Sequence, residues 1–324
     1  MKRGGRGPVF FFRAAAVFLL FCLSFYSGGC RVEQKEGGEA RGPAAPVVVR
    51  DDSGALLEFT GFPKRIVSLA PSNTEILFAL GLENRVVGVT TYCDYPPAAR
   101  RKTKVGDLQA NIEQIVALKP DLVLAKWTLN KDAVIKLRKL KIPVLCVEPE
   151  SMEGVYRAIL MVAQVTGTED AGRRIVERMK SKINEVQRKL AGLTASQRPK
   201  VFIEVGDDPL FTAGSGTFID ELVRLAGGIN IAGDLQGYQM YSSEAVVEKN
   251  PDIILAPDSY YVDVGRVLKK RPGWEQIKAV KNNRIISQLD PNLINRPGPR
   301  AAEAVEAIAK AFYPEIFPEK ARDE

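Results

Sequence analysis

The chain has 324 residues, a formal net charge of +7 and no histidine. It also has no C-x-x-C pair and no glycine-rich phosphate loop, which disfavours zinc hydrolases, histidine-based catalytic triads and P-loop NTPases. Four of the positive charges lie in residues 1–29, so the charge falls to +3 without that segment and is weak evidence for binding nucleic acid.

The N-terminus has the pattern of a secretory signal. Lys2, Arg3, Arg6 and Arg13 precede the apolar run Ala14 to Tyr26, which is short for a membrane span. Ser27-Gly28-Gly29-Cys30 resembles the lipobox of bacterial lipoproteins, although an aliphatic residue is usual where Ser27 stands. We predict a lipoprotein signal peptide at 1–29 and lipidation of Cys30, with a plain secreted protein or an uncleaved anchor as alternatives.

The segment after Cys30 is polar and rich in Gly, Glu, Lys and Pro, so residues 30–46 are predicted to form a flexible tether. The rest of the chain is long enough for two domains. We expect an N-terminal lobe at 47–150, connecting helices at 151–196, a C-terminal lobe at 197–316 and a tail at 317–324.

An internal repeat indicates that the two lobes are related. Lys119-Pro-Asp-Leu-Val-Leu-Ala125 recurs as Asn250-Pro-Asp-Ile-Ile-Leu-Ala256, and each copy follows a short amphipathic helix pattern. The apolar strands beginning at Arg65 and Lys200 have a similar offset, and each leads into a helix. Alternating strands and helices predict parallel sheets, which bind ligands at the carboxyl ends of their strands.

A long helix is predicted between the lobes, after Gly167. Its apolar residues have helical spacing, and they are Ile175, Met179, Ile183, Val186 and Leu190. Thr168 is the expected N-cap and Gly192 the expected end. A helix of roughly 25 residues is about 37 Å long and would hold the lobes at a nearly fixed separation. The alternative is an ordinary packing helix within one domain.

Cys93 and Cys146 are the two cysteines that remain in the folded part. One disulfide is possible in an oxidising compartment. The expected strand order places them toward opposite edges of a sheet, however, so we favour free thiols.

Six segments, in this order, resemble class III periplasmic binding proteins, which deliver cobalamin, haem or iron-siderophore complexes to ABC transporters. They are Arg65 to Leu77, Val87 to Pro97, Val105-Gly-Asp107, Lys119 to Ala125, Leu225 to Asn230 and Arg296-Pro-Gly-Pro-Arg300. The resemblance covers residues 47–315. It implies an α/β fold with two Rossmann-like lobes, joined by one long backbone helix, and a ligand cleft between them.

The candidate ligand-binding residues stand in loops after predicted strands. The N-terminal lobe supplies Ser72, Asn73, Tyr92, Asp94, Tyr95 and Trp127, and the C-terminal lobe supplies Phe211, Tyr238, Tyr241, Tyr260 and Arg296. Clustered aromatic rings suit a large, flat or polycyclic ligand, and an arginine fork suits a phosphate or carboxylate. Each tyrosine has the alternative of covering the core of its own lobe, and Arg296 that of a surface ion pair.

The resemblance also implies that Arg296 contacts the ligand, that Tyr92 or Tyr95 could ligate ferric haem, and that an acidic residue on each lobe docks on the permease. Glu75 matches the first docking position. Glu221 is the choice for the second, although Arg224 stands where relatives often have the acid. A solvated helix face is the alternative for both glutamates. Arg300 is interpreted as structural.

The sequence therefore predicts a monomeric, extracytoplasmic, membrane-anchored binding protein that passes a metal chelate to an ABC permease dimer. Cobalamin or another corrinoid ranks first, and a ferric siderophore or haem is the alternative. We expect no catalytic residue, no resident cofactor or metal and no nucleic acid partner. An enzyme and a surface lipoprotein without a transport role are the less favoured alternatives.

Overall fold

A computed structural model describes residues 45–257 and 264–318. The signal peptide, most of the tether, Cys30 and Tyr260 lie outside the described residues. The calls made for these parts of the chain therefore remain predictions.

The first lobe contains a five-stranded, fully parallel sheet in the order β5-β4-β3-β6-β7. Its strands are β3 (Ile66–Ser68), β4 (Val86–Val89), β5 (Thr103–Lys104), β6 (Leu122–Ala125) and β7 (Val144–Cys146). A hairpin of β1 (Val47–Arg50) and β2 (Leu56–Phe59) precedes it. The two central strands, β3 and β6, are buried along their whole length, which explains their continuous apolar runs.

The second lobe contains a mixed sheet in the order β11-β9-β8-β12-β13, with β10 also paired to β8. Its strands are β8 (Lys200–Asp207), β9 (Leu210–Ala213), β10 (Ile229–Asn230), β11 (Tyr238–Met240), β12 (Ile253–Leu255) and β13 (Ile285–Ile286). The expectation of a parallel sheet is wrong for β9 and β11, which run antiparallel to their neighbours. The chain reverses after β8 in a turn containing Pro209, which lacks the N–H that would continue the strand pairing.

The predicted repeat has the same local structure in both lobes. The Asp121 carboxylate accepts hydrogen bonds from the backbone N–H groups of Lys64 and Arg65, both at 2.8 Å. The Asp252 carboxylate accepts one from Lys200 N at 2.9 Å. Each Pro-Asp therefore fixes one strand against its parallel neighbour, β6 against β3 and β12 against β8.

The helices of the first lobe and the connection are α1 (Pro71–Ala79), α2 (Ile112–Ala117), α3 (Trp127–Lys139), α4 (Met152–Thr166) and α5 (Glu169–Leu190). Those that follow are α6 (Phe218–Leu225), α7 (Ser243–Lys249), α8 (Val264–Leu268), α9 (Lys278–Lys281), α10 (Pro291–Asn295) and α11 (Ala301–Phe312). Short 3₁₀ helices cover Glu83–Arg85, Pro97–Arg101, Ala195–Gln197 and Trp274–Gln276.

The predicted long helix is α5, which has 22 residues and is therefore about 33 Å long. All five of its predicted apolar positions are buried. Thr168 is the N-cap residue, as predicted, but its side chain makes no capping bond, and its hydroxyl pairs with that of Thr166 at 2.9 Å.

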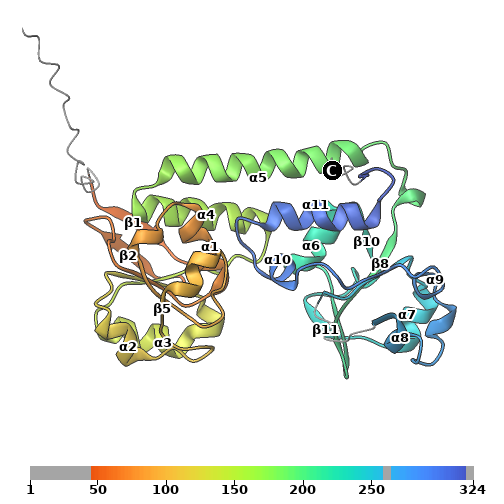
Figure 1. The fold of residues 1–324 in the computed structure, drawn as a ribbon, viewed down its shortest axis with the longest axis horizontal. Coiled ribbons are helices and arrows are strands. Elements are labelled where there is room, and N and C mark those ends of the chain that lie inside the picture. The colour runs from red at the N-terminus through yellow and green to blue at the C-terminus, as the bar shows by residue number, and fades with distance from the viewer. Residues whose placement is uncertain (1–44, 258–263, 319–324) are drawn as a thin grey trace, which may run out of the picture. The chain divides into compact units, whose positions relative to one another are not determined.

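Helix α5 packs on α4 and α11, and Figure 1 shows it running along both. One apolar cluster extends from the first sheet through α1, α4, α5, α11 and α6 to β8 and β12 of the second sheet. The connection between the lobes is therefore a packed layer of helices around α5, and not a free-standing rod.

Cys93 and Cys146 are both buried free cysteines. Cys93 follows β4, and Cys146 ends β7 on the far side of β3 and β6. Among the described residues, none of the helices has the length and apolar character needed to cross a membrane.

Candidate functional site

The carboxyl end of β4 leads into a loop that carries three of the predicted ligand residues. Tyr92 and Tyr95 have exposed side chains, and Asp94 is half-buried between them. Cys93 turns inward and its thiol lies 3.2 Å from the Thr90 hydroxyl. The buried cysteine anchors the loop, so its neighbours on either side are turned outward.

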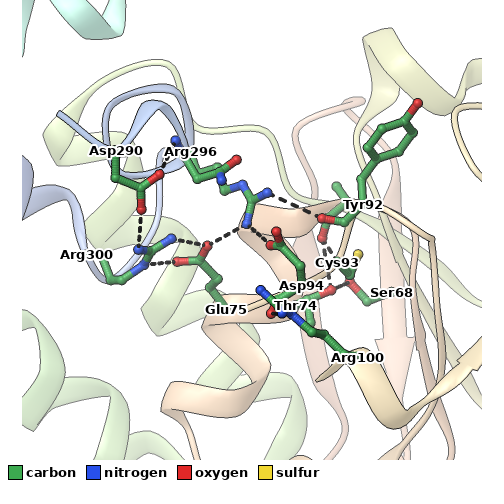
Figure 2. A network of polar contacts seen from close by, with 12 residues as sticks. Ser68, Thr74, Glu75, Tyr92, Cys93, Asp94, Arg100, Asp290, Arg296 and Arg300 are labelled. Carbon is green, nitrogen blue, oxygen red and sulfur yellow. Dashed lines mark hydrogen bonds and ion pairs between the residues drawn. The ribbon is translucent and has the colours of Figure 1, made fainter. Parts of the chain in front are cut away.

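Arg296 reaches this loop from the segment that follows α10. Its Nη1 donates to Asp94 Oδ1 at 2.6 Å and to Glu75 Oε1 at 3.3 Å, and Nη2 donates to the Tyr92 carbonyl at 3.3 Å. Figure 2 shows the guanidinium pointing between Asp94 and Glu75, whereas the Tyr92 ring points away from the network. The structure thus brings Arg296 to three residues that lie more than 200 positions earlier in the sequence.

Arg300, at the start of α11, completes the network. Its Nε and Nη2 both donate to the Glu75 carboxylate at 2.8 Å, which is a bidentate pair. The guanidinium also lies 3.9 Å from the centre of the Tyr95 ring. Arg300 therefore holds a buried acid on one side and an exposed ring on the other, in agreement with its interpretation as a structural residue.

The pKa of Asp94 is lowered from its usual value. Partial burial would raise the pKa, but the hydrogen bond and the positive charge of Arg296, together with the nearby Arg100, outweigh burial. Asp94 is therefore ionised at neutral pH and paired with Arg296.

The placement of Glu75 contradicts the exposed position that docking on a permease requires. Its side chain is 2% exposed and is held by Arg296 and Arg300. No sequence pattern near Glu75 indicates this burial, because both of its partners lie more than 200 residues away.

Glu221 has a defined role within the fold. Its Oε2 accepts a hydrogen bond at 2.7 Å from the backbone N–H of Met152, in the first turn of α4. A carboxylate there satisfies a free N–H group and interacts favourably with the helix dipole. Arg224 pairs with Asp220 of the same helix at 2.9 Å. The docking role of Glu221 stays a prediction.

Ser72 and Asn73 are buried in the first turn of α1. The Asn73 Nδ2 donates to the Ala125 carbonyl at 3.2 Å, so it ties the loop after β3 to the end of β6. Gly298 lies against the Ser72 backbone, which brings the Arg296 loop to the same place. Ser72 and Asn73 are therefore buried residues that hold the backbone segments next to the candidate site.

Trp127, at the start of α3, is placed elsewhere. It lines a groove of about 710 Å³ together with residues of the β1–β2 hairpin and the start of α4, such as Val48 and Arg157. In the same groove Thr128 N donates to Glu148 at 3.0 Å. Trp127 therefore lines a groove whose lining does not include Tyr92 or Asp94.

In the second lobe, Phe211 and Tyr238 lie on the antiparallel strands β9 and β11. Tyr238 is exposed and Phe211 half-buried. The Tyr241 ring packs on Phe202 of the second core, with ring centres 5.6 Å apart. For Tyr241, the alternative of covering its own lobe's core is the one that the structure supports.

Three exposed apolar residues near these loops were missed at the level of sequence. They are Leu108, in the loop after β5, Leu129, in the first turn of α3, and Met240, on β11. Leu108 and Leu129 line one groove of about 420 Å³. The only sequence signal of Leu108 and Leu129 is that each stands shortly after a strand. Single leucines are common in such positions, so they do not indicate a site.

Within the described parts of the chain, no group of three or more His, Cys, Asp or Glu side chains is arranged to hold a metal ion. The chemistry that the site offers is stacking on rings, hydrogen bonding by phenols and contact with a carboxylate-bound guanidinium. The ligand cleft between the lobes remains a prediction.

Comparisons with known proteins agree with this architecture. The model of the periplasmic binding protein family matches residues 66–291. An uncharacterised ABC transporter substrate-binding lipoprotein of Bacillus subtilis strain 168, YvrC, is 37% identical over 94% of this chain and 98% of its own length. A vitamin B12-binding protein of Vibrio cholerae is 30% identical over 76% of this chain and 88% of its own.

Among solved structures, the periplasmic haem-binding protein RhuT from Roseiflexus sp. RS-1, in its apo form, superimposes with a TM-score of 0.70 at 30% identity. The match covers 78% of this chain and 99% of RhuT. The family match and the two-lobed fold confirm the resemblance stated from the sequence motifs. The chain belongs to the periplasmic binding protein family, in the class that serves ABC importers.

Proposed function

We propose that this protein is an extracytoplasmic, lipid-anchored substrate-binding protein that captures a corrinoid, with cobalamin as the first candidate, and delivers it to an ABC permease. The observation that carries the proposal is the loop after β4. It exposes the rings of Tyr92 and Tyr95, and its Asp94 binds Arg296, which comes from near the other end of the chain. An aromatic surface next to polar groups suits a large ring system with a polar periphery.

The relatives support the ligand class. One is named as a vitamin B12-binding protein, and RhuT is named as haem-binding. Both ligands are flat metal chelates, so a surface of exposed rings serves either. Corrinoid ranks first because its metal arrives chelated and needs no protein ligand, whereas ferric haem would need one, such as the phenolate of Tyr92 or Tyr95.

Membrane anchoring through Cys30 is part of the proposal. The lipobox-like sequence at 27–30 supports it, and the Bacillus subtilis relative is named as a lipoprotein. Metabolic labelling with a radioactive fatty acid tests it. Label in the wild-type chain but not in Cys30→Ser is expected, and label in both, or in neither, would overturn the anchor.

Isothermal titration of the purified full-length chain in mild detergent tests the ligand. The ligands are cyanocobalamin, cobinamide, haemin and a ferric hydroxamate, with Arg296→Ala run alongside and the exposed Arg101→Ala as a matched control. Stoichiometric binding of a corrinoid that Arg296→Ala alone weakens is expected. Binding of haemin or the hydroxamate alone would overturn the corrinoid, and binding of none would overturn the chelate class.

A further inference from the structure

Two of the three acids around Arg296 and Arg300 are more exposed to solvent than the arginines themselves. The side chains of Arg296 and Arg300 are only 12% and 13% exposed, and that of Glu75 is 2% exposed. Asp94 and Asp290, the other two acids of the network, are 38% and 51% exposed. A ligand approaching this network therefore meets carboxylates before it meets guanidinium groups.

Arg296 also already donates hydrogen bonds to other residues of the protein. Both of its terminal nitrogens donate within the protein, and the shortest of these bonds is the one to Asp94, at 2.6 Å. An anionic group on a ligand must displace the Asp94 carboxylate from the guanidinium, or bind next to it. Either course is unfavourable, because an unpaired, partly buried carboxylate or a pair of like charges costs free energy.

A neutral periphery meets no such barrier. Primary amides can donate to the exposed carboxylate of Asp94, while the ring system rests on Tyr92 and Tyr95. The corrin ring carries amide side chains, and the one phosphate of cobalamin lies in its separate nucleotide loop, whereas haem carries two propionates on the ring itself. The pairing that holds Arg296 thus separates two ligand classes that have similar flat shapes.

We propose that Asp94 is a specificity-determining residue, which selects chelates with an amide or other neutral periphery against those with carboxylates by occupying Arg296. This rests on the proposed function, because it assumes that the loop after β4 contacts the chelate. It predicts a preference that depends on ligand charge at constant ligand shape.

Matched ligand pairs test this proposal. One pair is cyanocobalamin and its monocarboxylic acid derivative, in which one amide is replaced by a carboxylate. The other is haemin and its dimethyl ester. Dissociation constants are measured for the full-length wild-type chain, for Asp94→Asn and for Asp107→Asn. Asp107 is an exposed acid after β5 at the same edge of the sheet, so its variant makes the same charge change outside the network.

The wild-type chain is expected to bind the neutral member of a pair more tightly. Asp94→Asn should shift the ratio of the two dissociation constants toward the anionic member by about tenfold, the scale of one charge-assisted hydrogen bond. Asp107→Asn should leave the ratio within about twofold, since an unpaired surface charge contributes little. Asp94→Ser, analysed in the same way, is the second variant if Asp94→Asn fails to fold.

The outcomes distinguish this proposal from the function on which it rests. Binding of a pair with a ratio that neither Asp94 variant changes overturns the role of Asp94 and leaves the chelate-binding function standing. A wild-type preference for the anionic member also overturns it. Failure of the wild-type chain to bind any of the four ligands overturns both.

Discussion

Each lobe contains a buried glutamate held by both nitrogens of an arginine fork, but the two pairs connect different things. In the first lobe, Glu75 is bound by Arg300, 225 residues away, and also by Arg296. In the second, Glu204 accepts from Arg271 at 2.7 and 2.9 Å, and the two residues are 67 apart within one lobe. The Glu204–Arg271 pair connects two segments of one lobe. The Glu75–Arg300 pair connects the first helix of the fold to its last helix.

The residues exposed near the carboxyl ends of the strands also differ between the two lobes. The first lobe places charged groups around Glu75 and exposes the rings of Tyr92 and Tyr95 in the nearby loop, whereas the second has Phe211 and Tyr238 on the antiparallel strands β9 and β11. The shared repeat fixes the positions of the strands in both lobes. The loops at the carboxyl ends of the strands differ between the lobes, and binding is expected at these loops.

The largest effect is expected from removing the two glutamates. Glu75→Ala should lower the free energy of unfolding by about 3–5 kcal/mol, because it removes the bidentate partner of Arg300 and one of the acceptors of Arg296, both of which are poorly exposed. Glu204→Ala leaves one arginine and should cost less. Urea unfolding measures both, with the exposed Glu83→Ala as a control within about 0.5 kcal/mol. A larger loss in Glu204→Ala would break the comparison.

The two tryptophans give the next contrast, because each lobe has one. Trp274 is fully buried and donates to the Ser243 hydroxyl at 2.6 Å, whereas Trp127 lines an open groove. Trp274→Phe should destabilise the protein by about 2 kcal/mol, from lost packing and one hydrogen bond, and Trp127→Phe by much less. Acrylamide should quench the remaining Trp127 fluorescence more strongly. Equal quenching of the two would contradict this placement.

The Pro-Asp repeat sharpens the comparison further. Asp121 accepts two backbone hydrogen bonds and Asp252 accepts one, both at exposed positions. We expect Asp121→Ala to cost about 1–2 kcal/mol and Asp252→Ala about half as much. Chemical unfolding checks the order, with the exposed helical Asp132→Ala as a neutral control. A reversed order would mean that the copies are not equivalent.

The smallest effect concerns pH. The pKa of Asp94 is lowered in the folded state, so its pairing with Arg296 stabilises the fold above the usual carboxyl pKa. This contribution is lost as the pH falls through the lower folded value. The difference in urea midpoint between wild type and Asp94→Asn should therefore be present at pH 7 and shrink as the pH falls below the usual carboxyl pKa of 3.8. A difference that grows on acidification would contradict the pairing.

Local patterns predicted much of the fold. The spacing of the apolar residues from Ile175 to Leu190 predicted the long helix. The two Pro-Asp copies predicted that the lobes are related. Each of these patterns is contained in a short stretch of sequence, so it can be recognised without knowing the fold. The sequence analysis did not predict the reversal into β9, although the end of β8 and the turn, residues 206–209, have a composition of Gly, Asp and Pro that is typical of turns. That signal was outweighed by the expectation of a parallel repeat.

The candidate site was predicted only in part. The approach of Arg296 to Tyr92 and Asp94 agrees with the network in Figure 2, and Tyr95 of the same loop lies against Arg300. The burial of Glu75 and the separate groove of Trp127 were not foreseen. Both depend on contacts between distant segments, and residue type and spacing carry no information on such partners.

Amide hydrogen exchange of the full-length chain, with and without saturating cyanocobalamin, tests most directly where the ligand binds. The account predicts new protection in the loop at 91–95, in the segment at 295–298 and in the paired strands β9 and β11. Protection confined to the groove around Trp127, at 127–131 and 148–157, would contradict it.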